Sequence, residues 1–257
     1  GLGPWRKFLE RRHAAETKEP INIALVGKYD LQDAYKSIRE ALSQAGTYND
    51  RKVEVHFVNS EKLTDENVAE ALKGMAGVMI GPGFGQRGID GKFVAIKYTR
   101  THDIPTFGIC LGMQCIAIEF ARNVLGYADA DSREMDEKTP HNVIDIMEEQ
   151  KAITNMGGTM RLGAYECVLQ EGSKAYEAYG TEHIQERHRH RYEFNNDFRS
   201  LLTEKGLVLS GLSPDGKLVE MVELPDHPWF LAVQFHPEFK SRPNKAHPLF
   251  RDFVAAA

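Results

Sequence analysis

At 257 residues the chain is long enough for one sizeable hydrophobic core, and 42% hydrophobic with 27% charged residues describes an ordinary globular protein. A formal net charge of −5 argues against a nucleic-acid groove as the main activity, and no apolar run approaches the ~18 residues that a membrane span requires. Three cysteines without a C-x-x-C pair argue against disulfide or zinc frameworks, so we expect a cytoplasmic protein without a bound metal.

Residues 1–20 form a charged, helix-like stretch that leads to Pro20. We interpret this stretch as an interdomain linker, with a cloning remnant at its first glycines. The following residues, 21–257, are interpreted as one folded domain.

Strand and helix signals alternate from residue 21 onward. Apolar runs or strict alternation predict strands over 21–26, 53–58 and 76–80 and a strand ending at residue 109, while helices are predicted over 33–45, 64–72, 92–102 and 111–123. Short strands follow over 143–147, 165–169, 207–212, 218–224 and 230–235. This order predicts an α/β fold, with an open, mostly parallel sheet flanked by helices and extra short antiparallel strands in the C-terminal half.

Cys110 lies between two glycines, Gly108 and Gly112, where the strand ending at Ile109 passes into a helix. Flanking glycines allow the sharp turn of a nucleophile elbow, with Cys in place of Ser. The N-terminus of a helix also favours a thiolate over a thiol. We therefore expect Cys110 to be a nucleophile, whereas Cys115 and Cys167 fit packing positions.

His236 follows an apolar strand near the other end of the chain, in the sequence His236-Pro237-Glu238. Glu238 can hydrogen-bond the imidazole and fix its tautomer, so Cys110, His236 and Glu238 have the roles of nucleophile, general acid/base and orienter. The loops after Ile80, Ile109 and Phe235 follow strands of the expected sheet, where open α/β folds place their ligands.

The elbow and the late His-Pro-Glu together resemble the class I glutamine amidotransferases. Further segments resemble the glutaminase domain of the CTP synthase family: NIALVGKY (22–29), DAYKS (33–37), GGTMRLG (157–163), ERHRHRYEFNN (186–196) and HPWF (227–230). The resemblance extends over most of residues 21–253. It implies a class I glutamine amidotransferase domain over 21–257.

The resemblance implies a binding site for L-glutamine. Its residues would be Gly83, Phe84, Leu111, Gly112, Met113, Gln114, Glu134 and Arg191. Arg191 offers a planar fork of donors for the substrate α-carboxylate, and Glu134 offers a negative charge for its α-ammonium. The Leu111 N–H would help to hold the developing oxyanion.

The loop GPGFG (81–85) departs from the Pro-Gly-Gly-Phe-Gly of the family. Pro82 takes the place of a glycine whose N–H is the expected second oxyanion donor, and proline has no N–H. Either Gly81 or Gly83 could supply the donor, and we assign Gly83 together with Leu111. A smaller departure is Asp90, where the family tends to have Glu in a segment linked to GTP activation.

The basic run Arg187-His188-Arg189-His190-Arg191 permits several interpretations. A zinc site is disfavoured because two imidazoles stand among three cations and no carboxylate or thiol is spaced to complete it. A solvated basic loop is one alternative, and a phosphate or nucleic-acid contact is another, because alternation would place the arginines on one face. The resemblance associates Arg87, Arg161, Arg187 and Arg189 with GTP.

The activity implied by the resemblance is hydrolysis of glutamine, through a Cys110 thioester, to glutamate and ammonia. A synthase domain absent from this chain would bind ATP and Mg²⁺ and use the ammonia to convert UTP into CTP, with GTP as allosteric activator. This domain itself would need no cofactor. The full-length protein would be a homotetramer, and the isolated domain a monomer. The alternatives are a glutaminase subunit for another acceptor and a weakly active or non-catalytic regulatory module.

Overall fold

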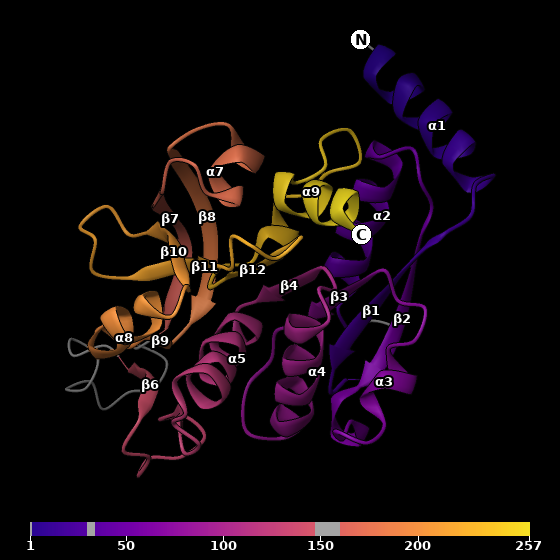
Figure 1. Cartoon of the computed structure of the whole chain (residues 1–257). Helices are drawn as coiled ribbons and strands as arrows, with labels where there is room; N and C mark the ends of the chain where they lie inside the picture. Colours follow the sequence, from indigo (N-terminus) through magenta and orange to yellow (C-terminus); the bar gives the residue numbers. More distant parts are fainter. Residues whose placement is uncertain (1, 30–33, 147–159) are drawn as a thin grey trace.

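The computed structural model describes residues 2–29, 34–146 and 160–257. Its main feature is a nine-stranded sheet in the order β2-β1-β3-β4-β12-β11-β10-β7-β8 (Figure 1). The strands are β1 (Ile21–Gly27), β2 (Val53–Asn59), β3 (Gly77–Ile80), β4 (Thr106–Ile109), β7 (Arg161–Leu169), β8 (His183–His190), β10 (Val208–Leu212), β11 (Val219–Glu223) and β12 (Phe230–Val233). The five strands from β2 to β12 are parallel, and the pairs from β12 to β8 are antiparallel.

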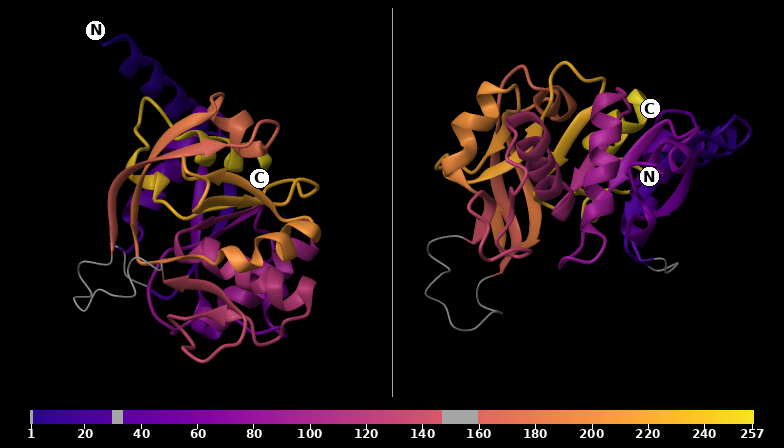
Figure 2. Two further views of the ribbon diagram at one scale, coloured as in Figure 1. Left: turned by 90° about the vertical axis from the view of Figure 1, so that its left-hand side faces the viewer. Right: turned by 60° about the horizontal axis from the view of Figure 1, so that its bottom comes forward.

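Helices cover both faces of the parallel half of this sheet (Figures 1 and 2). The helices are α1 (Gly3–Glu16), α2 (Lys36–Tyr48), α3 (Val68–Ala71), α4 (Ile89–Thr101), α5 (Leu111–Phe120), α7 (Lys174–Tyr179), α8 (Arg199–Glu204) and α9 (Pro248–Ala256). Alternate residues of β1 belong to two cores: Ala24 and Val26 pack with α4 and α5, whereas Ile23 and Leu25 pack with α2 and α9. The mostly parallel α/β architecture predicted from the alternation is therefore confirmed.

A small second sheet contains β5 (Asp131–Ser132), β6 (Asn142–Ile146) and β9 (Tyr192–Phe194), in that order. Because β9 begins two residues after β8 ends, the chain passes directly from the large sheet to the small one. Arg191 lies at this junction.

Several predicted boundaries differ from the structure. The helix expected over 64–72 is only α3: residues 65–67 form turns, and the Asn67 side chain accepts the Thr64 N–H, a contact typical of a helix N-terminus. α4 begins at Ile89, three residues earlier than expected, and the helix predicted over 111–123 passes into a π-turn at Ala121–Leu125. Asp33, Met147 and Gly157–Thr159 lie outside the described residues.

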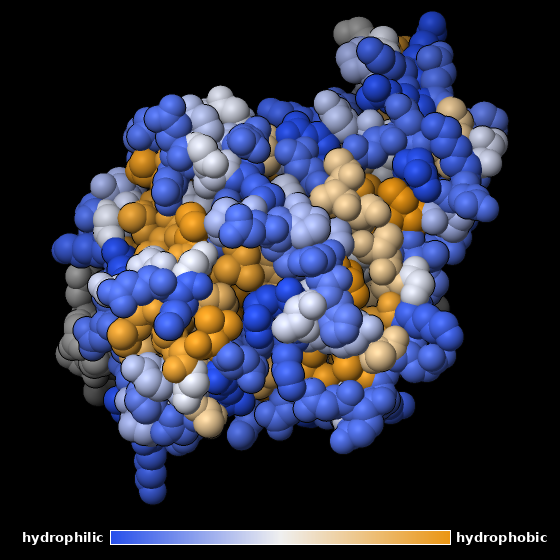
Figure 3. Space-filling model, in the orientation of Figure 1, coloured by the Kyte–Doolittle hydropathy of each residue, from blue (hydrophilic) through white to orange (hydrophobic). Residues whose placement is uncertain are grey.

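The sequence patterns predict no helix over α7, α8 or α9 and no strand over β5, β8 or β9. β8 is strongly charged, and its buried residues Glu186 and His188 contact His247 and Glu220, which lie far away in the sequence. The expectation that alternation places arginines on one face is confirmed for Arg187 and Arg189, which are exposed. Among the described residues, no helix has the length and apolar character to cross a membrane. The molecular face in Figure 3 is mostly hydrophilic, with apolar side chains gathered in several places.

Candidate active site

Cys110 stands at a strained elbow between β4 and α5. Its backbone angles are φ 54° and ψ −105°, outside the regions that non-glycine residues favour. The Cys110 N–H donates to the Val233 carbonyl at 2.8 Å, and the Cys110 carbonyl accepts the Met113 N–H at 3.0 Å. These bonds hold the elbow in position.

The two flanking glycines permit close packing around this elbow. A Cβ atom at Gly112 would lie 2.3 Å from the Ile80 carbonyl oxygen, and one at Gly108 would lie 2.9 Å from Ile116 Cδ1. Both distances are shorter than a carbon–carbon or carbon–oxygen contact allows. The glycines are therefore needed because β3 and α5 approach the elbow closely.

His236 and Glu238 lie beside the elbow because β12 runs parallel to β4, with Val233 opposite Ile109. His236 Nδ1 hydrogen-bonds Glu238 Oε1 at 2.7 Å, and both side chains are buried. Burial lowers the pKa of His236, but the neighbouring Cys110 and Glu238 side chains outweigh it and raise the pKa to about 10. The imidazole is therefore held in its protonated form near neutral pH.

Cys110 borders two cavities. The larger, of about 350 Å³, is lined by Cys110, His236 and Glu238 together with the loop residues Pro82, Gly83 and Phe84. The smaller, of about 20 Å³, is lined by Gly83, Phe84, Cys110, Gln114, Glu134, His190, Arg191 and Tyr192. The structure thus brings together around one sulfur the predicted acid/base pair and five of the predicted glutamine-binding residues.

The other three predicted glutamine-binding residues, Leu111, Gly112 and Met113, form the first turn of α5. They do not line the smaller cavity. Its volume is close to the 10–15 Å³ that one water molecule needs, so the walls must move apart to admit an amino acid.

The loop of residues 81–85 forms the wall between the two cavities and is clamped by charged side chains. The ammonium of Lys92, a buried residue, donates to the Gly81 carbonyl at 2.7 Å, and Lys28 donates to the Phe84 carbonyl. Burial lowers the pKa of Lys92 to about 8. Glu134 accepts the Gly85 N–H at 2.9 Å. The two lysines bind carbonyl oxygens of this loop, so they do not occupy its backbone N–H groups.

One of these amides is already used by the protein. The Gly81 N–H donates to the Val26 carbonyl at 3.0 Å, and Pro82 has no N–H. Across the described ranges, neither Gly83 N–H nor Leu111 N–H has a hydrogen-bond acceptor. Of the two glycines considered in the sequence, Gly83 is therefore the one whose N–H remains unused beside Cys110.

Gln234 is a further residue of this site, which the motifs in the sequence do not indicate. It is fully buried, and its side-chain nitrogen lies 3.8 Å from Cys110 Sγ. Its side-chain oxygen lies 3.3 Å from the nitrogen of Gln114. The signal in the sequence is a single amide residue, two positions before His236, at the end of an otherwise apolar strand.

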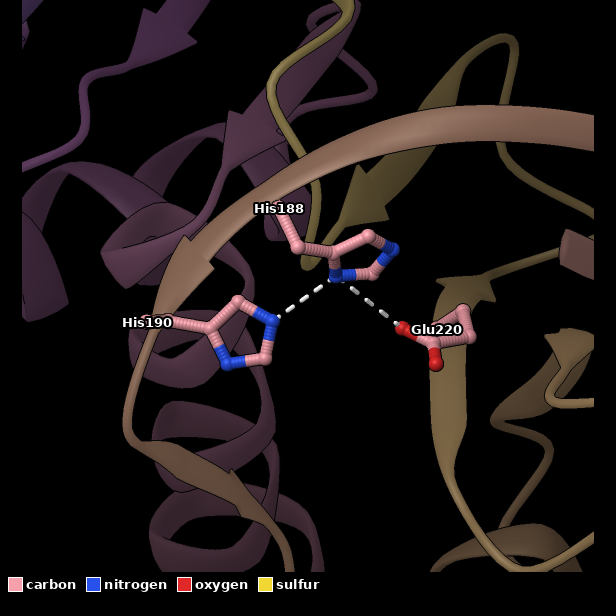
Figure 4. A group of neighbouring side chains, drawn as sticks. All are labelled: His188, His190 and Glu220. Atoms are coloured by element: carbon pink, nitrogen blue, oxygen red, sulfur yellow. Dashed lines mark hydrogen bonds and ion pairs between the residues drawn. The ribbon is translucent and has the colours of Figure 1, made fainter. Parts of the chain in front are cut away.

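His188, His190 and Glu220 form a buried cluster behind the smaller cavity (Figure 4). His188 Nδ1 lies 2.8 Å from His190 Nε2 and 3.6 Å from Glu220 Oε2. The expectation that no carboxylate could complete a ligand set was wrong, because β11 brings Glu220 to the two imidazoles. The three residues could hold a metal ion on distance alone.

Arg161 already supplies a cation to this cluster. Its Nη1 lies 2.7 Å from Glu220 Oε1 and 3.3 Å from Glu193 Oε1. Burial, together with the charge of Arg161, lowers the pKa of His188 to about 2 and that of His190 to about 3, so both imidazoles are neutral. An added divalent cation would be repelled by the guanidinium.

The four arginines associated with GTP do not lie in one place. Arg187 and Arg189 are exposed on β8, and Arg189 stands over the Phe84 ring at 6.0 Å. Arg87 is exposed beside Glu61, at 3.5 Å. Arg161 is buried against its two carboxylates, so its guanidinium is not presented to a ligand in this conformation.

Comparisons with known proteins agree on one family. The model of the class I glutamine amidotransferases matches residues 30–256. A CTP synthase of Bacteroides thetaiotaomicron is 85% identical over the whole chain, and one of Caldanaerobacter subterraneus is 59% identical over 99% of it. The chain spans about half the length of these curated relatives, 48% and 47% respectively.

Solved structures give the same result. The glutaminase domain of Trypanosoma brucei CTPS, with bound acivicin, matches with a TM-score of 0.86 and 38% identity, covering 92% of this chain and 93% of that one. A putative GMP synthase subunit from Thermoplasma acidophilum matches with a TM-score of 0.59 and 18% identity, which shows a shared fold alone.

Proposed function

This chain belongs to the class I glutamine amidotransferase family and is a glutaminase domain of the CTP synthase type, and we propose that it hydrolyses L-glutamine through a thioester on Cys110. The observation that carries this proposal is the position of Cys110. The sulfur borders both the small polar cavity and the cavity that contains the hydrogen-bonded pair His236–Glu238.

The substrate would be held in the smaller cavity by its α-groups. Arg191 pairs with the α-carboxylate, and Glu134 accepts hydrogen bonds from the α-ammonium. Glu134 also accepts the Gly85 N–H, and a carboxylate has enough lone pairs for both partners. The side-chain amide carbon then faces Cys110.

In the acylation step the Cys110 thiolate attacks the amide carbon, and the carbonyl electron pair moves to oxygen. The N–H groups of Leu111 and Gly83 stabilise this oxyanion. The His236 imidazolium then donates its proton to the amide nitrogen, the carbon–nitrogen bond breaks, and ammonia leaves. A glutamyl thioester and a neutral imidazole remain.

In the second step His236 removes a proton from water as the water oxygen attacks the thioester carbon. The tetrahedral intermediate expels the Cys110 thiolate and gives glutamate. Glu238 keeps the imidazole oriented through the bond to Nδ1 and stabilises its charged form. This returns the site to its starting protonation state.

The activity of the longer protein is a further part of the proposal. We propose that the ammonia passes to a synthase domain of the full-length chain. That domain would bind ATP and Mg²⁺ and aminate UTP to CTP. The full-length protein would be a cytoplasmic homotetramer. GTP would activate the glutaminase through exposed arginines, with Arg187 and Arg189 as the first candidates. Arg161 would act only after leaving its buried ion pairs.

The test measures glutamate release by the chain and by the variant Cys110→Ala, with and without GTP. We expect release by the wild-type chain to exceed that of the variant, whose rate equals background. Mass spectrometry after treatment with a glutamine-mimicking alkylator should place the label on Cys110, which lines both cavities, and not on Cys115, whose pKa burial raises to about 12. Equal background rates together with an unlabelled Cys110 would overturn the proposal.

A further inference from the structure

Gln234 connects the sulfur of Cys110 to the side chain of Gln114. Gln234 Nε2 lies 3.8 Å from Cys110 Sγ, and Gln234 Oε1 accepts from Gln114 Nε2 at 3.3 Å. The second donor contact of Gln114 Nε2 is the Tyr192 carbonyl, at 3.2 Å. Both glutamine side chains are buried. A chain of amide hydrogen bonds thus extends from a backbone carbonyl to the nucleophile.

The Tyr192 carbonyl determines the direction of this chain. A carbonyl oxygen only accepts, so Gln114 must present its NH₂ group to Tyr192. The other proton of that NH₂ is directed to Gln234 Oε1, which leaves the Gln234 NH₂ facing the sulfur. Reversing both amides would place the Gln114 oxygen against the Tyr192 oxygen, which is repulsive.

The two protonation states of Cys110 have different partners. The thiol donates toward the Arg189 carbonyl, at 3.9 Å. A thiolate cannot donate to that carbonyl, and it is repelled by the oxygen. Within the described ranges, Gln234 Nε2 donates to the sulfur at 3.8 Å, whereas His236 Nε2 is buried without a hydrogen-bond partner. A donor of this kind favours the charged form of an acceptor.

We propose, on the basis of the glutaminase function above, that Gln234 is a catalytic residue: its side-chain N–H stabilises the Cys110 thiolate, and its oxygen fixes Gln114 with Oε1 toward the substrate. Both protons of the Gln114 amide are used, so Gln114 recognises a donor on the substrate, either the α-ammonium or the NH₂ of the side-chain amide. Gln114 therefore does not bind the α-carboxylate, which is left to Arg191.

The experiment compares Gln234→Met with the wild-type chain. Methionine has a similar length and no N–H group. The rate of Cys110 alkylation by iodoacetamide, followed by mass spectrometry, is measured against pH. We expect the midpoint of this profile to rise by about one pH unit, because a hydrogen bond to a charged group stabilises it by roughly that amount. We also expect kcat to fall about tenfold.

The matched variant Gln114→Met retains Gln234 beside the sulfur. We expect it to raise KM for glutamine and to move the midpoint of alkylation less than Gln234→Met does, because the donor at the sulfur is kept and only the bond that orients it is lost. Gln170→Met, at an exposed position, controls for the substitution itself. If Gln234 had only a structural role, Gln234→Met would lower the melting temperature, and the alkylation midpoints of Gln234→Met and Gln114→Met would not differ.

Unchanged alkylation midpoints in Gln234→Met would overturn the proposal. If that variant does not fold, Gln234→Asn replaces it, because asparagine is one methylene shorter and moves the N–H donor away from the sulfur. We expect a smaller rise of the alkylation midpoint in Gln234→Asn. An unchanged midpoint in this variant would also overturn the proposal. Because alkylation requires no glutamine turnover, failure of the proposed hydrolysis is distinguishable from failure of this inference.

Discussion

The Gly81 N–H donates to the Val26 carbonyl at 3.0 Å, and this bond decides which glycine can serve the oxyanion. The Gly81 N–H is used by β1, and Pro82 has no N–H. The next residue, Gly83, lies beside Leu111 and Cys110. The departure from the family loop therefore shifts the available donor by one residue and does not remove it. This relationship also weakens the case for a non-catalytic module.

Gly83→Pro and Gly83→Ala form a matched pair that tests this donor. Proline removes the N–H, whereas alanine keeps it, and a Cβ atom at this position would lie 3.5 Å from Leu111 Cδ2, an ordinary contact. We expect kcat to fall on the order of 10²-fold in Gly83→Pro and to change little in Gly83→Ala. Steady-state kinetics measures kcat, and circular dichroism checks that both variants are folded. Equal losses of kcat in both variants would show that the shape of the loop, and not its N–H group, is required.

Glu238→Gln tests the charge state of His236. The carboxylate contributes to the raised pKa of about 10, so its replacement by a neutral amide lowers the pKa of His236. Activity that needs the imidazolium should then decline at lower pH, and we expect the alkaline limb of kcat/KM to move down by about one unit or more. An alkaline limb at the wild-type position would contradict this.

The same pair contributes to stability. The pKa of His236 is raised on folding, so the stabilisation is complete below pH 6.5 and is lost as the pH rises through about 10. We expect chemical denaturation of Glu238→Gln to show a smaller loss of unfolding free energy between pH 6.5 and 10 than the wild-type chain shows.

Glu193→Gln tests the buried carboxylates around Arg161. Burial and the charge of Glu220 raise the pKa of Glu193 to about 8, so the folded chain loses stability as the pH rises from 4.5 to 8. A glutamine oxygen can still accept from Arg161 Nη1, and the side chain no longer ionises. We expect the variant to equal or exceed the wild-type unfolding free energy at pH 8.5, by on the order of 1 kcal/mol. A uniform loss at every pH would show that the charge of Glu193 is required.

Gly112→Ala tests the packing of the elbow. The added Cβ atom would lie 2.3 Å from the Ile80 carbonyl oxygen, so β3 or α5 must shift. Overpacking of this kind costs about 1–3 kcal/mol, and the displaced elbow should reduce glutamate release. Urea denaturation measures the cost, with Gly3→Ala as control, because nothing lies within 4 Å of a Cβ atom there. Wild-type stability in Gly112→Ala would exclude the close approach.

The local signals in the sequence were sufficient for the parallel half of the fold. Glycines on both sides of Cys110 predict the elbow, and an apolar strand before His236 predicts its position at the sheet edge, because parallel strands end on the same side. The helix over 64–72 is predicted too long, because the apolar pattern does not reveal the turns over residues 65–67 that precede α3.

By itself, the sequence predicted a nucleophile and its acid/base partner, and it indicated the family that the comparisons show, because these depend on residue types at short spacings. The tertiary structure alone decided which loop amide remains unused, which carboxylate meets His188 and His190, and which way the amides of Gln114 and Gln234 point. Each of these depends on a contact between residues far apart in the chain: Gly81 with Val26, Glu220 with His188, and Gln114 with Tyr192. Such pairs form only when strands from distant segments are placed side by side, and no local pattern specifies them.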